Sequence, residues 1–193
     1  ESPTHLMTSY EMDFIKAEVL FRQGDKGGAL TAYKNAIKGH LDFMNTKLKS
    51  YGTNNNPGKN PISQAAIDEF LASGCIAQAV NELTMAEIMK QKFIAMSFSQ
   101  QNWNDMRRFN FSAGNVGDFG VVYPDFDRPK SIRATAASQK FPGATKVDNS
   151  YWWRRMAHCS HEVNFNAKNL KESNSKATDN DIWSVSVWWD VAE

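Results

Sequence analysis

The chain of 193 residues has few cysteines and no excess of either charge. Its two cysteines, Cys75 and Cys159, allow at most one disulfide, and their redox state stays open. The 22 Lys and Arg residues nearly balance the 21 Asp and Glu residues, for a formal net charge of +1. Nucleic-acid-binding domains usually carry a clustered basic excess, so nucleic acid is not expected as a partner.

Long apolar runs are also missing. No stretch approaches the roughly 18 residues that a membrane-spanning helix needs. The first residues, ESPTHLMTSYEMDF, lack the basic start and apolar middle of a secretory signal. We therefore expect either an intracellular protein or a chain that begins partway through a longer one. Hydrophobic residues make up 41% of the sequence. This share is typical of a globular domain.

The first half of the sequence has the periodicity of amphipathic helices. One apolar face near the N-terminus consists of Met7, Tyr10, Phe14, Ala17 and Phe21. A second apolar stripe consists of Met12, Ile15 and Val19, so we expect this helix to be covered on two sides.

The stretch AEVLFRQGDKGGALTAYKNAI has the small/large pattern of a tetratricopeptide repeat, an antiparallel helix pair that needs neighbours to cover its faces. Gly24 falls in the predicted turn. Ala29 allows close approach of the two helices, and Tyr33 with Ala36 fills the groove between them.

Further helices are predicted up to residue 111. Ser63 is a candidate N-cap, and Thr84 with Glu87 forms a capping box. The segment NWNDMRRF gives another amphipathic turn. Residues 112–150 are rich in Gly, Asp, Pro and Ser and predict a long irregular segment. DIWSVSVWWD alternates in the manner of a short strand.

Three stretches together resemble one known family. They are YEMDFIKAEVLFRQGDKGGALTAYKNAI, AEIMKQKFIAMSFSQQNWNDMRRFNF, and RRMAHCSHEVNFNAKN with the later VWWD. In this order and spacing they resemble the SusD/RagB-like outer-membrane lipoproteins of Bacteroidetes. The resemblance runs from about Leu6 to Asp190 and leaves 112–150 unmatched.

The resemblance implies a mainly α fold, with tetratricopeptide-like helix pairs over 1–111 and irregular loops, a tail and a short strand over 112–193. It implies that residues 1–193 are a single domain or the C-terminal part of a larger SusD-like protein. The implied function is non-catalytic capture of oligosaccharides, without a cofactor, at the surface of the outer membrane. The implied partners are a SusC-like TonB-dependent transporter and the glycan, with a lipid anchor on a preceding segment.

The resemblance also assigns scaffold roles to a set of motif residues. These are Trp103, Asp105, Arg107, Arg108, Arg155, Glu162 and Asn166. Arginines at such a helix end usually pair with a nearby carboxylate, here Asp105. Two departures from the family pattern are Phe109-Asn110, where the family often has Thr-Gly, and His158-Cys159, where it has Tyr-Pro.

The cluster of His158, Cys159, His161 and Glu162 is open to three interpretations. Cys, His and carboxylate are zinc ligands, but structural zinc sites use two spaced pairs, and no second pair is present. Nucleophilic catalysis by Cys159 would need a base and an orienting group around it. We favour a scaffold in which Glu162 and Asn166 tie down an extended segment, with neither a metal nor a catalytic residue.

Aromatic side chains are the candidates for ligand contact. Flat Trp and Tyr rings stack on the apolar faces of sugars, and polar side chains bind the hydroxyl groups. Tyr151, Trp152 and Trp153 follow a polar loop, and Trp188 lies on the polar side of the predicted strand. The other tryptophans, Trp103, Trp183 and Trp189, are expected in the core.

Two other classes of function stay open. A tetratricopeptide-type module would bind a peptide or protein in a helical groove and ignore sugars. A glycoside hydrolase fragment would need paired carboxylates, and no pair is marked by its context.

Overall fold

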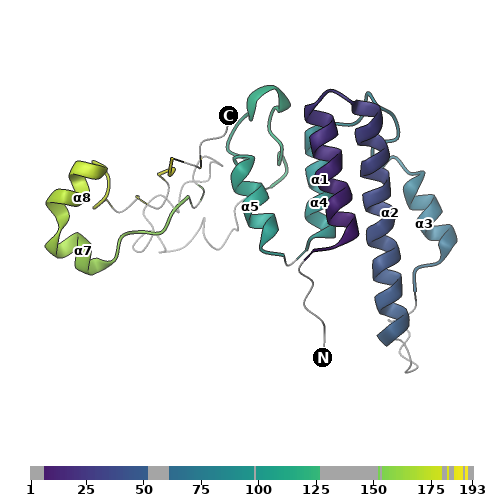
Figure 1. Ribbon diagram of the computed structural model, residues 1–193, viewed down its shortest axis with the longest axis horizontal. Helices are drawn as coiled ribbons and strands as arrows, with labels where there is room; N and C mark the ends of the chain where they lie inside the picture. Colours follow the sequence, from purple (N-terminus) through teal and green to yellow (C-terminus); the bar gives the residue numbers. More distant parts are fainter. Residues whose placement is uncertain are drawn as a thin grey trace. The chain divides into compact units, whose positions relative to one another are not determined.

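The computed structural model describes residues 7–51, 61–97, 99–126, 152, 154–179, 182, 185–188 and 190. They belong to two compact units, Glu1–Asn102 and Trp103–Glu193. The described residues form helices and loops, which confirms the mainly α fold class (Figure 1). No helix among them is both long enough and apolar enough to cross a membrane.

The unit Glu1–Asn102 is a layer of helices built on a long hairpin. Its helices are α1 (Ser9–Arg22), α2 (Lys26–Tyr51), α3 (Gln64–Leu71) and α4 (Met85–Ala95). Helix α1 packs along α2 and against α4, and α3 contacts α2 (Figure 1). The turn between α1 and α2 holds Gly24 at a φ of 84°. Glycine adopts this conformation without steric cost, so the predicted turn is confirmed.

Side-chain caps fix where these helices begin. Ser63 Oγ accepts a hydrogen bond from the Ala66 amide at 3.2 Å, and Thr84 Oγ1 accepts one from the Glu87 amide at 3.1 Å. Each cap satisfies a backbone donor that has no partner within its helix. Ser63 is confirmed as an N-cap, and so is the Thr84 half of the predicted capping box.

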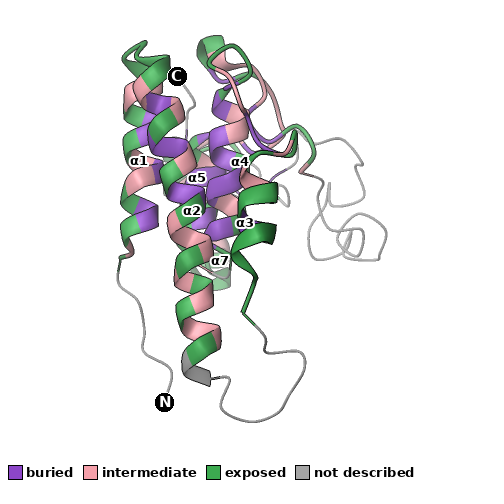
Figure 2. Ribbon diagram, turned by 90° about the vertical axis from the view of Figure 1, so that its right-hand side faces the viewer, coloured by how far each residue is buried: buried purple, intermediate pink, exposed green. Residues whose placement is uncertain are grey.

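The helix hairpin has the core that the repeat pattern predicted. Ala29, Tyr33 and Ala36 on α2 are fully buried, as are Phe14 and Ala17 on α1. Figure 2 shows buried stretches on the sides of α1, α2 and α4 that face one another. Small residues on α2 let the helices approach closely, and the two aromatic rings fill the space between them.

The second apolar stripe of α1 differs from the prediction. Met12 and Val19 are 47% and 45% exposed, so this side of the helix is not covered within the described part of the chain. The physical reason is that α2 and α4 both pack on the side that carries Phe14.

The unit Trp103–Glu193 contains shorter elements. Helix α5 (Gln101–Arg108) leads into it, and a 3-10 turn, η2 (Gly117–Phe119), follows. Two short helices come later, α7 (Ser160–Phe165) and α8 (Ala167–Ser173). The predicted short strand is not confirmed, since residues 185–188 have a bend, irregular backbone and a turn. The prediction of an extended segment around Glu162 is wrong, because that residue lies in α7.

Tyr33 predicts a loss of stability in alkali. Burial raises the pKa of its phenol, the nearby Ala77 backbone opposes this, and the Glu87 charge raises the pKa further. The unfolded chain ionises this group above about pH 10, whereas the folded chain keeps it neutral. The free energy of unfolding is therefore unaffected by ionisation of Tyr33 below about pH 10, and it falls as the pH rises above that value.

We expect Tyr33→Phe to leave stability at pH 7 nearly unchanged, because the lost hydroxyl has no hydrogen-bond partner. We expect the variant to lose less stability than the parent chain between about pH 9 and about pH 11. Urea unfolding followed by circular dichroism measures both. An equal loss in the two proteins would contradict the assignment.

Candidate functional site

The candidate site begins at the C-terminal end of α5, where the sequence Trp-Asn-Asp-x-Arg-Arg lies. Arg108 donates to Asp105 Oδ1 at 2.8 Å, which confirms the predicted pairing for this arginine. Arg107 points elsewhere: its Nη2 donates to the backbone carbonyl of Arg154 at 2.8 Å. The two adjacent arginines therefore serve different partners, one within the helix and one far along the sequence.

A buried ion network joins α5 to the C-terminal tail. The side chain of Asp190 is 2% exposed and lies between two arginines. Arg154 Nη1 donates to Asp190 Oδ1 at 3.3 Å, and Arg107 Nη2 lies 3.4 Å from Oδ2 without forming a hydrogen bond. Burial lowers the pKa of the Arg154 guanidinium, the Asp190 charge opposes this, and Arg107 lowers it further.

The backbone after α5 is held in an unusual conformation. Asn110 and Phe111 have φ values of 56° and 52°. Few residues other than glycine adopt this left-handed region. Asn110 Oδ1 accepts a hydrogen bond from Arg154 Nη2. Asparagine is among the residues that tolerate this region best, which explains how it stands where the family that the sequence resembles often has glycine.

Phe111 is the centre of an aromatic layer. Its ring is fully buried and stacks on Trp152, with centroids 4.5 Å apart and planes at 3°. The Arg154 guanidinium lies 5.0 Å from the Phe111 centroid. Phe126 stacks on Trp152 at 5.3 Å, and Trp103 meets Phe111 edge-on. The Phe111 side chain is therefore held on several sides at the position where its own backbone has a positive φ.

The predicted ligand-contact aromatics have different surroundings. Trp152 is 6% exposed, in the aromatic layer, whereas Trp188 is 85% exposed. Tyr151 and Trp153 lie outside the described residues. Of the two candidates that the structure describes, Trp188 is the exposed one.

Of the three tryptophans expected in the core, the structure describes only Trp103, and it differs from the prediction. Trp103 is 39% exposed, because on the short helix α5 it contacts Phe111 only by an edge. Trp183 and Trp189 lie outside the described residues, so their predicted burial stays a prediction.

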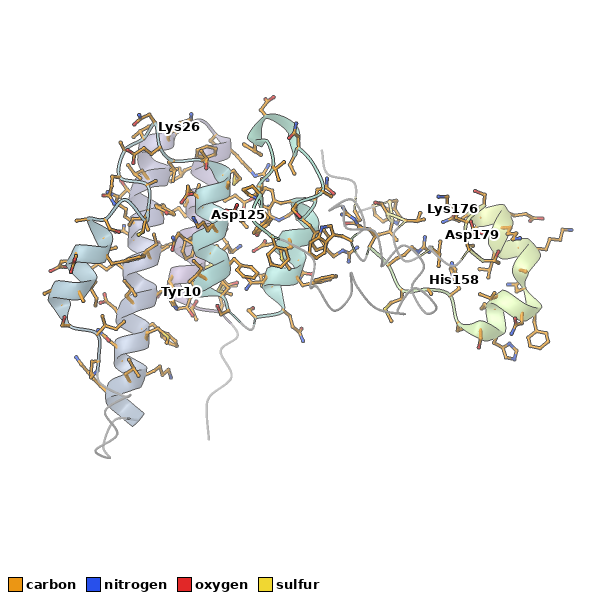
Figure 3. All side chains as sticks on the ribbon, turned by 180° about the vertical axis from the view of Figure 1, so that it is seen from behind. Tyr10, Lys26, Asp125, His158, Lys176 and Asp179 are labelled. Atoms are coloured by element: carbon orange, nitrogen blue, oxygen red, sulfur yellow. The ribbon has the colours of Figure 1, made fainter. Side chains whose placement is uncertain are left out.

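The His and Cys cluster does not converge. His158 lies on the segment that leads into α7 (Figure 3), and its Nε2 is 3.5 Å from Arg155 Nη2. The His161 ring packs on Phe165, with centroids 4.8 Å apart. Asn166 donates to Glu162 Oε2 at 2.8 Å. Across the ranges that the structure describes, no group of three or more His, Cys, Asp or Glu side chains could hold a metal ion.

Comparison with known families shows to which family the chain belongs. A SusD-like family model, described as "starch-binding associating with outer membrane", matches residues 1–115, more than half of the chain. The chain belongs to this SusD-like family. No curated protein and no solved structure matches it. SusD-like proteins are a binding, non-catalytic family, and membership indicates glycan binding associated with the outer membrane.

The matched SusD-like region includes all of α5 together with Asn110 and Phe111. Sequence reasoning missed Arg154 and Asp190 as partners, because nothing local in the sequence brings these two residues together. The signal available was weak: Arg154 stands next to the motif residue Arg155, and Asp190 closes the Trp-Trp-Asp ending.

Proposed function

We propose that this SusD-like chain binds oligosaccharides without cleaving them, with the indole of Trp188 stacking on a sugar ring. The observation that carries the proposal is the 85% exposure of Trp188 in a chain of a glycan-binding family. A flat exposed aromatic ring supplies apolar contact area to the C–H face of a pyranose at low conformational cost. Tyr151 and Trp153 remain further candidates for the same role.

The proposal extends to where the protein works. We infer that the bound glycan passes to a SusC-like TonB-dependent transporter, and that a lipid anchor outside these residues holds the protein at the cell surface. The family description, which names the outer membrane, supports this. Affinity purification from the native cells should recover a TonB-dependent transporter with this protein, and labelling with palmitate should mark it.

Replacing Trp188 with alanine should weaken binding of starch oligosaccharides about tenfold, the equivalent of about 1.4 kcal/mol. Migration in native gels that contain soluble starch, followed by calorimetric titration with maltoheptaose, measures the effect. Phe165→Ala is the matched control, since Phe165 is also a highly exposed aromatic residue, at 79%. It should leave the affinity unchanged.

The proposed role of Trp188 is wrong if the two variants bind equally well. Absence of binding by the parent chain to maltoheptaose, and to oligosaccharides of xylan, mannan and pectin, would contradict glycan capture itself.

A second candidate function is a module that binds a peptide or protein. The exposed stripe of Met12 and Val19 on α1 favours it, because the outer face of a helix pair is where a further helix would pack. A library of helical peptides distinguishes the two functions: binding that Met12→Lys abolishes, with no affinity for sugars, would support this alternative.

A further inference from the structure

Described residues on both sides of Trp188 in the sequence are held in place. Ile182 is 3% exposed, and the Val185 amide donates to the Ile182 carbonyl at 3.1 Å. On the other side, the Asp190 amide donates to the Val187 carbonyl at 2.9 Å, which closes a turn around Trp188. The most exposed tryptophan described in the chain therefore lies two residues from one of its most buried carboxylates.

The anchor at Asp190 is electrostatic and long-range. Arg154 and Arg107 reach its carboxylate from parts of the sequence remote from the tail. Arg154 is in turn held by the Asn110 side chain and by the Phe111 ring. Since a buried carboxylate is stable only when paired, its position is set by these arginines rather than by the tail itself.

We propose that Asp190 is a positioning residue for ligand binding, which holds the hydrogen bond between Asp190 and Val187 in place so that the Trp188 indole is presented in one position. This inference rests on the proposed stacking role of Trp188. A ring that is ordered before binding loses less conformational freedom on binding, so anchoring it raises affinity without adding a contact to the ligand. Asp190 itself is buried and acts through Trp188.

A double-mutant cycle tests the assignment, with maltoheptaose as the probe and calorimetric titration as the readout. Asp190→Asn keeps the shape and removes the charge. We expect it to weaken binding about fivefold in the parent chain and to have no further effect when Trp188 is already alanine. Asp190→Glu, which keeps the charge, should recover part of the affinity.

A general structural role gives a different pattern. If Asp190→Asn weakens binding by the same factor in both backgrounds, or not at all in the parent chain, the positioning role is wrong. Failure of the proposed Trp188 role gives a separate result: Trp188→Ala alone then binds maltoheptaose with the same affinity as the parent chain. If Asp190→Asn does not fold, Arg107→Gln takes its place, since Arg107 is 24% exposed and Arg154 still pairs with the carboxylate.

Discussion

Replacing Arg154 with alanine is expected to destabilise the unit Trp103–Glu193 by about 3–5 kcal/mol, because it removes one partner of a buried ion pair. Arg154 is 8% exposed. Its guanidinium pairs with Asp190, donates to Asn110 and lies over the Phe111 ring. Arg107 stays close to Asp190, but its 3.4 Å approach lacks hydrogen-bond geometry. Urea unfolding, followed by tryptophan fluorescence, measures the change.

The control is an ion pair at the surface. Lys38 and Asp42 lie 2.6 Å apart on α2 with about half of each side chain exposed, at 51% and 50%. Lys38→Ala should therefore cost only about 0.3–0.5 kcal/mol. Replacing both buried partners, as Arg154→Met with Asp190→Leu, should restore most of the lost stability, because no buried charge is left unpaired. Equal effects of Arg154→Ala and Lys38→Ala would contradict the buried network.

Phe14→Ala is the second large effect, with an expected loss of about 3–5 kcal/mol from the unit Glu1–Asn102. Phe14 is fully buried on the face of α1 that packs against α2 and α4. Truncation removes apolar contacts and leaves a cavity that the rigid helix pair cannot close. Far-UV circular dichroism in urea reports on the helices of this unit.

Met12→Ala on the same helix is the matched control, because Met12 is 47% exposed. Its truncation should change stability by at most about 0.5 kcal/mol, as is usual for surface substitutions. If Met12→Ala and Phe14→Ala lower the free energy of unfolding equally, the assignment of Phe14 to the buried face of α1 is wrong.

Much of the helical unit could be predicted because its determinants are local. Ser63 and Thr84 bond to amides three residues on, and the spacing of Ala29, Tyr33 and Ala36 marks one helical face. The prediction that the Met12 stripe is covered was wrong, because periodicity identifies an apolar stripe but does not show whether a neighbouring element covers it.

The site was less predictable because its contacts join distant residues. Arg154 and Asp190 are 36 positions apart in the sequence, and no local pattern around either residue predicts that they pair. Neither the left-handed backbone at Phe111 nor the burial of Trp152 follows from composition, because both depend on the aromatic layer that the two rings form together. Glu162 falls in a helix that the family pattern of an extended segment did not predict.

Titration of the parent chain with maltoheptaose, with reducing sugar measured before and after incubation, tests the central claim most directly. The account predicts saturable binding that Trp188→Ala weakens, with no increase in reducing ends. Binding accompanied by new reducing ends would make the protein a hydrolase. No binding to maltoheptaose, or to the other glycans named above, would contradict glycan capture.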